Sequence, residues 1–326
     1  AALERARTGD EIWLRAGVHS ISQPLRVPAG VALVGGFAGT ENTAAERLGI
    51  NFARESTVRM TRPGASVLVL AEVRDVRVDG LTLTGTTHAP AVAVHGCGPD
   101  VRFAHVRIAG NAAEGAGAAI RIVGGSEPHF FNCQFADNTS AAPEGGGGIF
   151  VDASSGGSWD TCIVNGNVAQ GARGGGALII GGAAKPVRFV RTDFYFNEAA
   201  RTGSALAAQG PLELLDCVVS SNLCRSAEPG HAIAAQADAA RITLSGQSYV
   251  VSNVADRDRP VLVRGVDGEG RAELRDEALF APSDTGPADL AVHTSRNDVH
   301  ITLHDVFMPP LTAGAPAPGR WVRQTL

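Results

Sequence analysis

The stretch "FFNCQFADN", residues 130–138, decides the fold because its ending recurs along the chain. The recurring pattern is an apolar residue, two variable residues and an asparagine, as in "FADN" at 135–138. Successive asparagines of this pattern stand 25 to 31 residues apart, at Asn111, Asn138, Asn167, Asn197, Asn222 and Asn253. Self-similarity at such a period predicts a repeat architecture.

The positions before each asparagine also repeat. The residue three places before it is apolar in every unit. The residue five places before it is small or apolar, at Val106, Cys133, Cys162, Thr192, Cys217 and Ser248. This alternation predicts a short strand with one face turned inward. A glycine-rich strand start such as "GGGGIFV" at 145–151 then follows, so each unit holds several strands and shows no helical periodicity.

A unit of this size cannot bury its apolar face alone, so neighbouring units must stack on it. Stacking equivalent strands about 4.8 Å apart predicts an all-β fold, a right-handed parallel β-helix solenoid. We expect each repeat asparagine to bond its own turn and the asparagine one coil away. Asparagine suits such a turn because it tolerates a left-handed backbone. A leucine-rich horseshoe is the rival solenoid, but its leucine framework is missing.

The chain reads as a single β-helix domain over residues 1–306 with an extended tail at 307–326. Within the domain we predict a cap at 1–10, asparagine-ladder coils over about 76–253 and irregular coils at 254–306. The tail has the proline and glycine spacing of an extended segment, and we expect it to lie along a surface or to reach a partner.

At the N-terminus, a short amphipathic helix at Ala2–Thr8 is predicted to cover the open end of the core, as a solenoid requires. Strands are expected at Glu11–Arg15 and Val31–Val34.

Composition excludes several classes of function. The formal net charge is −5 and the basic residues are scattered, so nucleic acid is not an expected partner. No apolar run approaches the roughly 20 residues of a membrane span. No signal peptide is visible, but the abrupt opening "AALERARTGDEIWL" (residues 1–14) is expected to belong to a processed or partial polypeptide.

Two segments carry a family resemblance. "GDEIWLRAGVH" (9–19) and "GVALVGGFAGTENTAAER" (30–47) resemble the N-terminal segment of secreted β-helix proteins. The paired Gly-Gly-Ala/Ile and Phe-x-x-Asn repeats resemble those of polymorphic outer-membrane-type adhesins and related pectate-lyase-like proteins. The resemblance covers roughly residues 3–253 and implies export to a surface or periplasmic location. It leaves activity open, because this architecture hosts enzymes, adhesins and scaffolds.

The cysteines and the glycine runs are predicted to be structural. Cys133, Cys162 and Cys217 share one inward column with Thr192, so we expect small core side chains. A Cys133–Cys162 disulfide is the alternative, although parallel stacking aims the sulfurs poorly. The runs at 145–148 and 174–176 lack the Gly-Lys-Ser/Thr ending of a phosphate loop, so close backbone packing is expected.

The outward columns supply the candidate site residues. Nine places before each asparagine-type position stand Arg77, Arg102, His129, Ser158, Arg188 and Glu213. Six places before it stand His105, Asn132, Thr161, Arg191 and Asp216, with Asp193 nearby. We expect Arg188–Glu213 and Arg191–Asp216 to form ion pairs between coils, as a solvated sheet face favours. The basic strip of Arg77, Arg102 and His129 is a candidate binding site for an anionic sugar or an acidic partner.

Three further features of the sequence allow both a structural and a functional interpretation. Asp160 interrupts the otherwise apolar column of Ala104, Phe131, Val190 and Leu215. We expect this column to face inward, so the Asp160 carboxylate would need a buried partner. Trp159 is expected in the core, with sugar stacking as the alternative. His300 and His304 lie four apart near Asp298 and Asp305, but a third metal ligand is not evident, and no metal or cofactor is predicted.

The favoured interpretation is a non-catalytic, exported scaffold or interaction subunit, located outside the cytoplasm. Its expected partners are other protein subunits, bound through a flat face or the tail, and polysaccharide is possible. The alternative is a polysaccharide lyase or hydrolase that uses Arg188, Arg191, Asp193, Asp216 and His129.

Overall fold

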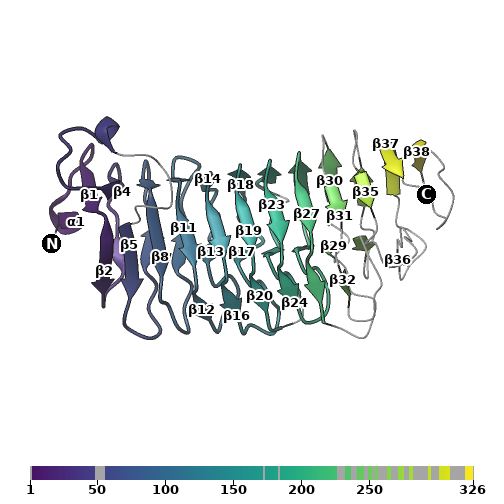
Figure 1. Ribbon diagram of the computed structural model, residues 1–326, viewed down its shortest axis with the longest axis horizontal. Coiled ribbons are helices and arrows are strands. Elements are labelled where there is room, and N and C mark those ends of the chain that lie inside the picture. Colours follow the sequence, from purple (N-terminus) through teal and green to yellow (C-terminus); the bar gives the residue numbers. More distant parts are fainter. Residues whose placement is uncertain are drawn as a thin grey trace.

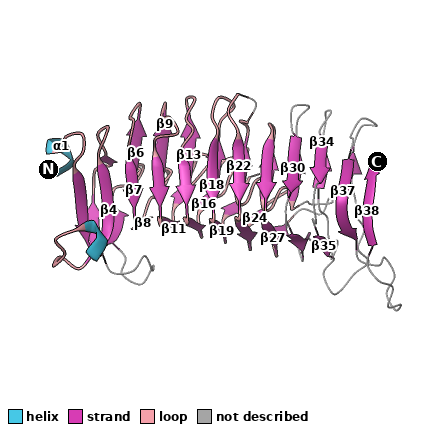
Figure 2. Ribbon diagram, turned by 90° about the horizontal axis from the view of Figure 1, so that it is seen from above, coloured by secondary structure: helices cyan, strands magenta, loops and turns pink. Residues whose placement is uncertain are grey.

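The computed structural model describes residues 2–47, 56–171, 173–182, 184–225 and 232–235, and beyond these the strand segments named below. It shows an all-β parallel β-helix in which the strands stack side by side along the long axis (Figures 1 and 2). The predicted fold class is confirmed.

Two rows of parallel strands, together with the antiparallel strand β38, form a 22-stranded sheet. Row A consists of β1 (Glu11–Arg15), β4 (Ala32–Phe37), β7 (Arg77–Asp79), β10 (Arg102–Ala104), β14 (His129–Phe131), β18 (Gly157–Asp160), β22 (Val187–Val190), β26 (Leu212–Leu215), β30 (Arg241–Ser245), β34 (Arg271–Leu274) and β37 (Ile301–Met308). Row B consists of β2 (Gly17–Ile21), β5 (Ser56–Met60), β8 (Leu81–Thr84), β11 (Arg107–Ala109), β15 (Gln134–Ala136), β19 (Ile163–Asn165), β23 (Asp193–Tyr195), β27 (Val218–Ser220), β31 (Tyr249–Val251) and β35 (Leu279–Ala281). The rows join where β37 pairs with both β34 and β35.

Two further sheets complete the solenoid. A six-stranded sheet, row C, holds β12 (Ala112–Ala113), β16 (Thr139–Ser140), β20 (Val168–Ala169), β24 (Glu198–Ala199), β28 (Leu223–Cys224) and β32 (Val254–Ala255). A ten-stranded sheet, row D, holds β3 (Leu25–Arg26), β6 (Leu68–Ala71), β9 (Val92–His95), β13 (Ile120–Val123), β17 (Ile149–Val151), β21 (Ala177–Ile179), β25 (Leu206–Ala208), β29 (Ile233–Ala235), β33 (Val263–Gly265) and β36 (His293–Thr294). From β10 to β33 the chain therefore runs A, B, C, D once per coil, whereas the first three coils, β1 to β9, run A, B, D.

The two ends differ from the predicted detail. The predicted helix is shorter, since α1 spans only Ala2–Arg5, although Leu3 and Ala6 pack against the core as a cap should. The strand expected at Val31–Val34 is β4, which extends to Phe37. Within the predicted tail, β38 (Arg320–Thr325) pairs antiparallel with β37 and so lies along the sheet.

Two columns of left-handed residues turn the chain within each coil. Between rows A and B stand Gly80, His105, Asn132, Thr161, Arg191 and Asp216, all with positive φ. Directly before the asparagine column stand Gly85, Gly110, Asp137, Gly166, Phe196 and Ser221, also with positive φ. The asparagine column itself is not left-handed, so the predicted backbone role belongs to the residue before it.

The asparagine ladder is confirmed for the five members that the structure describes, and Asn253 lies outside the described residues. Each backbone N–H from Asn111 to Asn197 donates to the Oδ1 of the next asparagine at 3.0–3.2 Å. Each Nδ2 donates to the same Oδ1 at 2.9–3.0 Å. All five are buried, so the ladder satisfies polar groups inside the bend.

The core between the sheets is built from columns of inward side chains. Phe103, Phe130, Trp159 and Phe189 stack on consecutive coils with ring centroids 4.6–5.1 Å apart. Trp159 is fully buried, so its predicted core role is confirmed.

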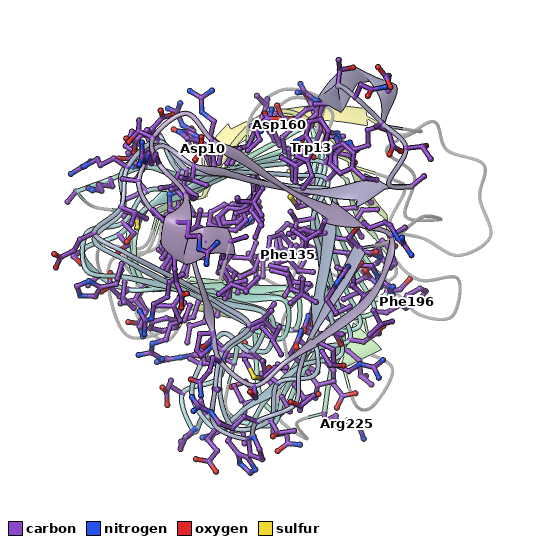
Figure 3. The ribbon with its side chains drawn as sticks, turned by 90° about the vertical axis from the view of Figure 1, so that its left-hand side faces the viewer. Asp10, Trp13, Phe135, Asp160, Phe196 and Arg225 are labelled. Carbon is purple, nitrogen blue, oxygen red and sulfur yellow. The ribbon has the colours of Figure 1, made fainter. Side chains whose placement is uncertain are left out.

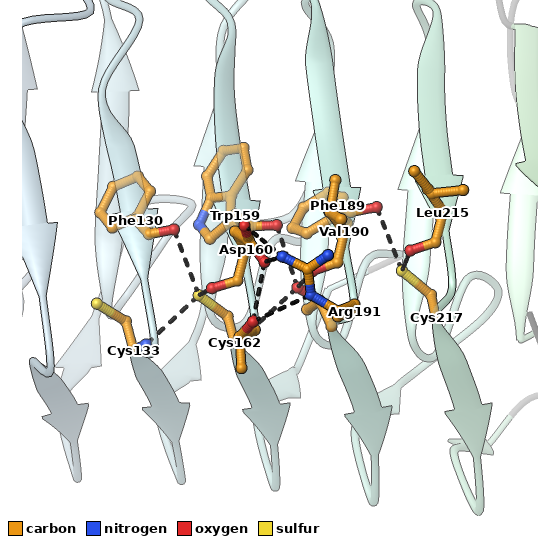
Figure 4. Close-up of polar contacts among 12 residues, drawn as sticks. Phe130, Cys133, Trp159, Asp160, Cys162, Phe189, Val190, Arg191, Leu215 and Cys217 are labelled. Atoms are coloured by element: carbon orange, nitrogen blue, oxygen red, sulfur yellow. Dashed lines mark hydrogen bonds and ion pairs between the residues drawn. The ribbon is translucent and has the colours of Figure 1, made fainter. Parts of the chain in front are cut away.

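The inward column of Cys133, Cys162, Thr192 and Cys217 lies beside the aromatic stack (Figure 4). The cysteines of the column are free thiols, as predicted. The Cys133 N–H donates to Cys162 Sγ and the Cys162 N–H to Thr192 Oγ1, both at 3.4 Å. Burial raises the pKa of the Cys217 thiol to about 12, so this side chain stays protonated. The column is therefore a second, weaker polar ladder.

The glycine runs pack as predicted. A Cβ at Gly147 would lie 2.2 Å from the Gly175 carbonyl oxygen, and one at Gly175 would lie 2.2 Å from that of Ser204. Backbones of successive coils therefore meet here without room for a side chain.

Row D and rows A and B differ on their outer faces. The outer side of row D is covered, because Phe150, Leu178 and Ala207 are buried in a cluster with Ala116 and Ala142 from the preceding loops. Side chains on the outer faces of rows A and B reach solvent, as the alternating burial of β10 and β14 shows. These two rows carry the candidate residues.

Candidate functional site

The outward column predicted on row A exists as one register line. Strand pairing aligns Arg102 with Arg77 on one side and with His129 on the other, and continues through Ser158 to Arg188 and Glu213. Neighbouring members stand one strand spacing apart, about 4.8 Å.

Ion pairs occupy two of the three arginines in this column. Arg77 Nη2 lies 2.9 Å from Glu11 Oε1, and Arg188 Nε lies 2.6 Å from Glu213 Oε2. The predicted Arg188–Glu213 pair is therefore present. Within the described part of the chain, the guanidinium of Arg102 has no ion pair, and Arg102 is exposed. Of the predicted basic strip, Arg102 is thus the cation available to a ligand.

His129 is held between two coils. Its Nδ1 is hydrogen-bonded to the hydroxyl of Ser158 on the next strand. Partial burial lowers the pKa of His129, with Glu127 opposing the shift and Arg102 adding to it. The imidazole is therefore neutral at neutral pH and can act as a hydrogen-bonding group.

The second outward column corrects one prediction. The repeat pattern predicts an inward column of Ala104, Phe131, Asp160, Val190 and Leu215, but this column points outward. Phe131 is 50% exposed and Leu215 38% exposed. The inward residues are one place earlier, at Phe130 and its equivalents. Asp160 is thus a surface carboxylate in an apolar strip.

Asp160 finds its partner on the following coil. Arg191 Nη2 donates to both carboxylate oxygens of Asp160 at 2.6 and 2.7 Å, and Thr161 Oγ1 donates to Oδ1 at 2.9 Å (Figure 4). The sequence predicted Asp216 as the partner of Arg191, but the bidentate contact is made to Asp160. This geometry fixes the Arg191 guanidinium against row A.

Asp193 lies near the other predicted enzyme residues but outside this ion pair. It opens β23 on row B, two residues after Arg191. Burial raises the pKa of its carboxyl group. Among the described residues, no side chain or backbone group donates a hydrogen bond to this carboxylate.

One polar cluster was missed by the sequence interpretation. Asp79, at the end of β7, is 7% exposed. Its Oδ1 lies 3.2 Å from Arg47 Nη2 and 3.1 Å from His105 Nδ1. Arg47 also donates to the Gly35 carbonyl oxygen at 3.2 Å, so the cluster ties the 38–47 loop to the stack. The only signal in the sequence was an acidic residue in the apolar column of Val34 and Ala104.

The asparagine ladder also has an end that was missed. The backbone N–H and the hydroxyl of Thr86 both donate to Asn111 Oδ1 at 3.2 Å. Thr86 precedes Asn111 by 25 residues, so the repeat period was the only sequence feature that indicated Thr86 as a member of the ladder.

In the part of the chain that the structure describes, no three His, Cys, Asp or Glu side chains gather as a metal site would require. His300 lies outside the described residues. Of the helices described, none has the length and hydropathy needed to cross a bilayer.

The chain was compared with known protein families, proteins and structures. No protein-family model, curated protein or solved structure matches this chain.

Proposed function

We propose that this chain is an exported, non-catalytic β-helix that acts as an interaction subunit and binds an acidic protein partner on row A. The contact region is the Arg102 patch, formed by Arg102, His129 and Phe131. Export is supported by the resemblance of residues 9–47 to secreted β-helix proteins.

The availability of Arg102 carries the proposal. The other two arginines of the column, Arg77 and Arg188, are paired with Glu11 and Glu213, whereas Arg102 has no ion pair within the described residues. The patch can therefore accept an external carboxylate without breaking an ion pair of the fold.

The apolar part of the patch favours a protein over a small anion. Phe131 lies two residues after His129 on the outer face and is half exposed, with His105 packed edge-on against its ring at 5.8 Å between centroids. Arginine and aromatic side chains are enriched at the energetic centres of protein interfaces. The paired state of Asp160 and Glu213 also favours a scaffold, because catalytic carboxylates are usually left free to react.

The test is quantitative affinity purification, after mild crosslinking, from the cells that make the protein. Wild type is compared with R102E/F131A and with R62E, a matched charge reversal at an exposed arginine of the loop before row D. We expect one set of partners to be retained by wild type and R62E and reduced about tenfold or more by R102E/F131A. Equal recovery with all three proteins would reject the Arg102 patch as the contact region.

A second candidate function rests on Asp193. The Asp193 carboxyl is half-buried, has a raised pKa and accepts no hydrogen bond from the residues that the structure describes. Such a group suits a general acid, and Arg191 stands two residues away. This arrangement supports a polysaccharide lyase or hydrolase. Turnover of a panel of acidic and neutral polysaccharides that is lost in D193N would favour the enzyme and overturn the scaffold proposal.

A further inference from the structure

One corner residue of the solenoid breaks two rules of local structure. Phe196 lies in the corner directly before the asparagine ladder, and its φ of 56° is left-handed. This conformation is unfavourable for a bulky side chain. Burial does not compensate for it, because Phe196 is 66% exposed, and Figure 3 shows Phe196 at the outer margin of the coil while Phe135 lies at its centre. Strain that packing does not offset is typical of functional positions.

A second aromatic ring lies against Phe196. Tyr195, the last residue of β23, packs edge to face with it, with ring centroids 5.4 Å apart and an angle of 89° between the planes. Tyr195 is partly buried, whereas most of the Phe196 ring is open to solvent. The two rings therefore form perpendicular walls at the corner between rows B and C.

The same corner on the two preceding coils completes the arrangement. On the coil before Phe196 the corner residue is Gly166, whose N–H donates to the Tyr195 carbonyl at 3.2 Å. On the coil before that it is Asp137, and a Cβ at Gly166 would lie 2.4 Å from Asp137 Oδ1. The carboxylate therefore leans over the glycine, toward the rings. Asp137 and Phe196 are two strand spacings apart, about 10 Å, so the space over Gly166 has a carboxylate on one side and an aromatic ring on the other.

The Asp137 carboxylate is available to a ligand. It is exposed, and among the residues that the structure describes it accepts no hydrogen bond and forms no ion pair. On the adjoining row C, the Glu198 carboxylate is already paired with Arg225, with Nη2 and Oε2 2.8 Å apart. The charge left uncompensated at this corner is therefore negative, which favours a cation.

We propose that this corner binds an arginine side chain of a partner protein, with the guanidinium stacked on Phe196 and its edge directed at Asp137. Arginine fits both groups, because its planar guanidinium stacks on aromatic faces and donates two parallel hydrogen bonds to a carboxylate. Gly166 leaves the space that the guanidinium needs between them. The corner shares no residue with the Arg102 patch on row A, so it adds a second contact region of opposite charge preference.

The test is NMR spectroscopy of the full chain with ¹³C-labelled tyrosine rings. The chain has two tyrosines, so Tyr195 reports on the corner and Tyr249 serves as the internal reference. The probes are the peptide acetyl-Gly-Arg-Gly-amide and its uncharged citrulline counterpart, at equal ionic strength. We expect the arginine peptide to shift the Tyr195 signal with a dissociation constant on the order of 10 mM, and the citrulline peptide to bind about fivefold or more weakly.

Two variants that suit the left-handed backbone locate the site. F196N removes the ring and D137N removes the charge, and asparagine is tolerated at both corners. Each should raise the dissociation constant of the arginine peptide about fivefold or more. D75N is the matched control, because Asp75 is also an exposed aspartate with a left-handed φ of 52° but lies on a different turn. It should bind the peptide like wild type, and circular dichroism checks that all variants keep the fold.

Three outcomes overturn the proposal. Equal binding of the arginine and citrulline peptides would show that charge plays no part. Affinity that F196N or D137N leaves unchanged would place the peptide elsewhere. An unshifted Tyr195 signal would exclude the corner as a contact region. All three are independent of the Arg102 patch, because neither variant alters it.

Discussion

At the scale of single residues, Asn167 shows why the repeat requires this side chain. Its N–H and Nδ2 donate to Asn197 Oδ1, and its Nδ2 also donates to the Phe135 carbonyl at 2.8 Å. Its Oδ1 accepts from the N–H and the Nδ2 of Asn138. An amide has a donor and an acceptor at one branch point, so it can bond both neighbouring coils. Serine or aspartate could not replace all of these bonds.

Replacing Asn167 with alanine should therefore destabilise the fold strongly. The change removes the Oδ1 that accepts from the Asn138 N–H and the Nδ2 that donates to the Phe135 carbonyl. A buried group left unpaired costs about 1–3 kcal/mol. We expect the free energy of unfolding to fall by about 3 kcal/mol or more, measured by urea denaturation. N165A is the matched control, because Asn165 faces outward and its Oδ1 accepts only from Gln134 Nε2 in the described part of the chain. A loss in N167A no larger than that in N165A would contradict the ladder's role.

At the scale of elements, the coil is shaped by its left-handed corners. Glycine occupies the corner before the ladder in three coils, but Asp137, Phe196 and Ser221 occupy it in others. A left-handed residue with a side chain costs about 1–2 kcal/mol, and asparagine is among the residues that bear this best. Phe196 is 66% exposed, so its side chain gains little burial in return.

Changing Phe196 to asparagine should stabilise the protein. We expect the free energy of unfolding to rise by about 1 kcal/mol through relief of the φ of 56°. Differential scanning calorimetry provides the measurement. F131N is the matched control, since Phe131 is also exposed but lies in an extended strand, and it should bring no gain. Equal effects of both changes would attribute the result to surface polarity instead of backbone conformation.

The corners also explain which predictions succeeded. The repeat period predicted the stacked strands. The alternation of inward and outward residues correctly predicted that Cys133 and Phe135 both face inward. Extending the same inward-outward alternation back past Asn132 wrongly predicts that Phe131 faces inward. The left-handed φ of 49° at Asn132 turns the chain, so Phe130 faces inward in place of Phe131. The same shift misplaced Asp160. Partners set by side-chain reach, such as Arg191 with Asp160 and Arg47 with Asp79, depend on that turn and could not be obtained from column matching.

At the scale of the whole molecule, each coil is stabilised by the coils beside it. Each coil contacts only its neighbours, so local stability depends on how many neighbours a strand has and how well it is buried. Central coils have both, together with the asparagine ladder and the aromatic stack. Among the described residues, β1 and β2 each pair with one other strand, and neither contains a fully buried residue.

Hydrogen exchange followed by mass spectrometry should therefore show a gradient from the N-terminal end. We expect amides in residues 11–21 to exchange about tenfold or more faster than those in 133–138 at low protein concentration, because opening an end coil disrupts fewer contacts. Uniform protection along the stack at low concentration would mean that the solenoid unfolds as a single unit and that its first coil is no weaker than its centre.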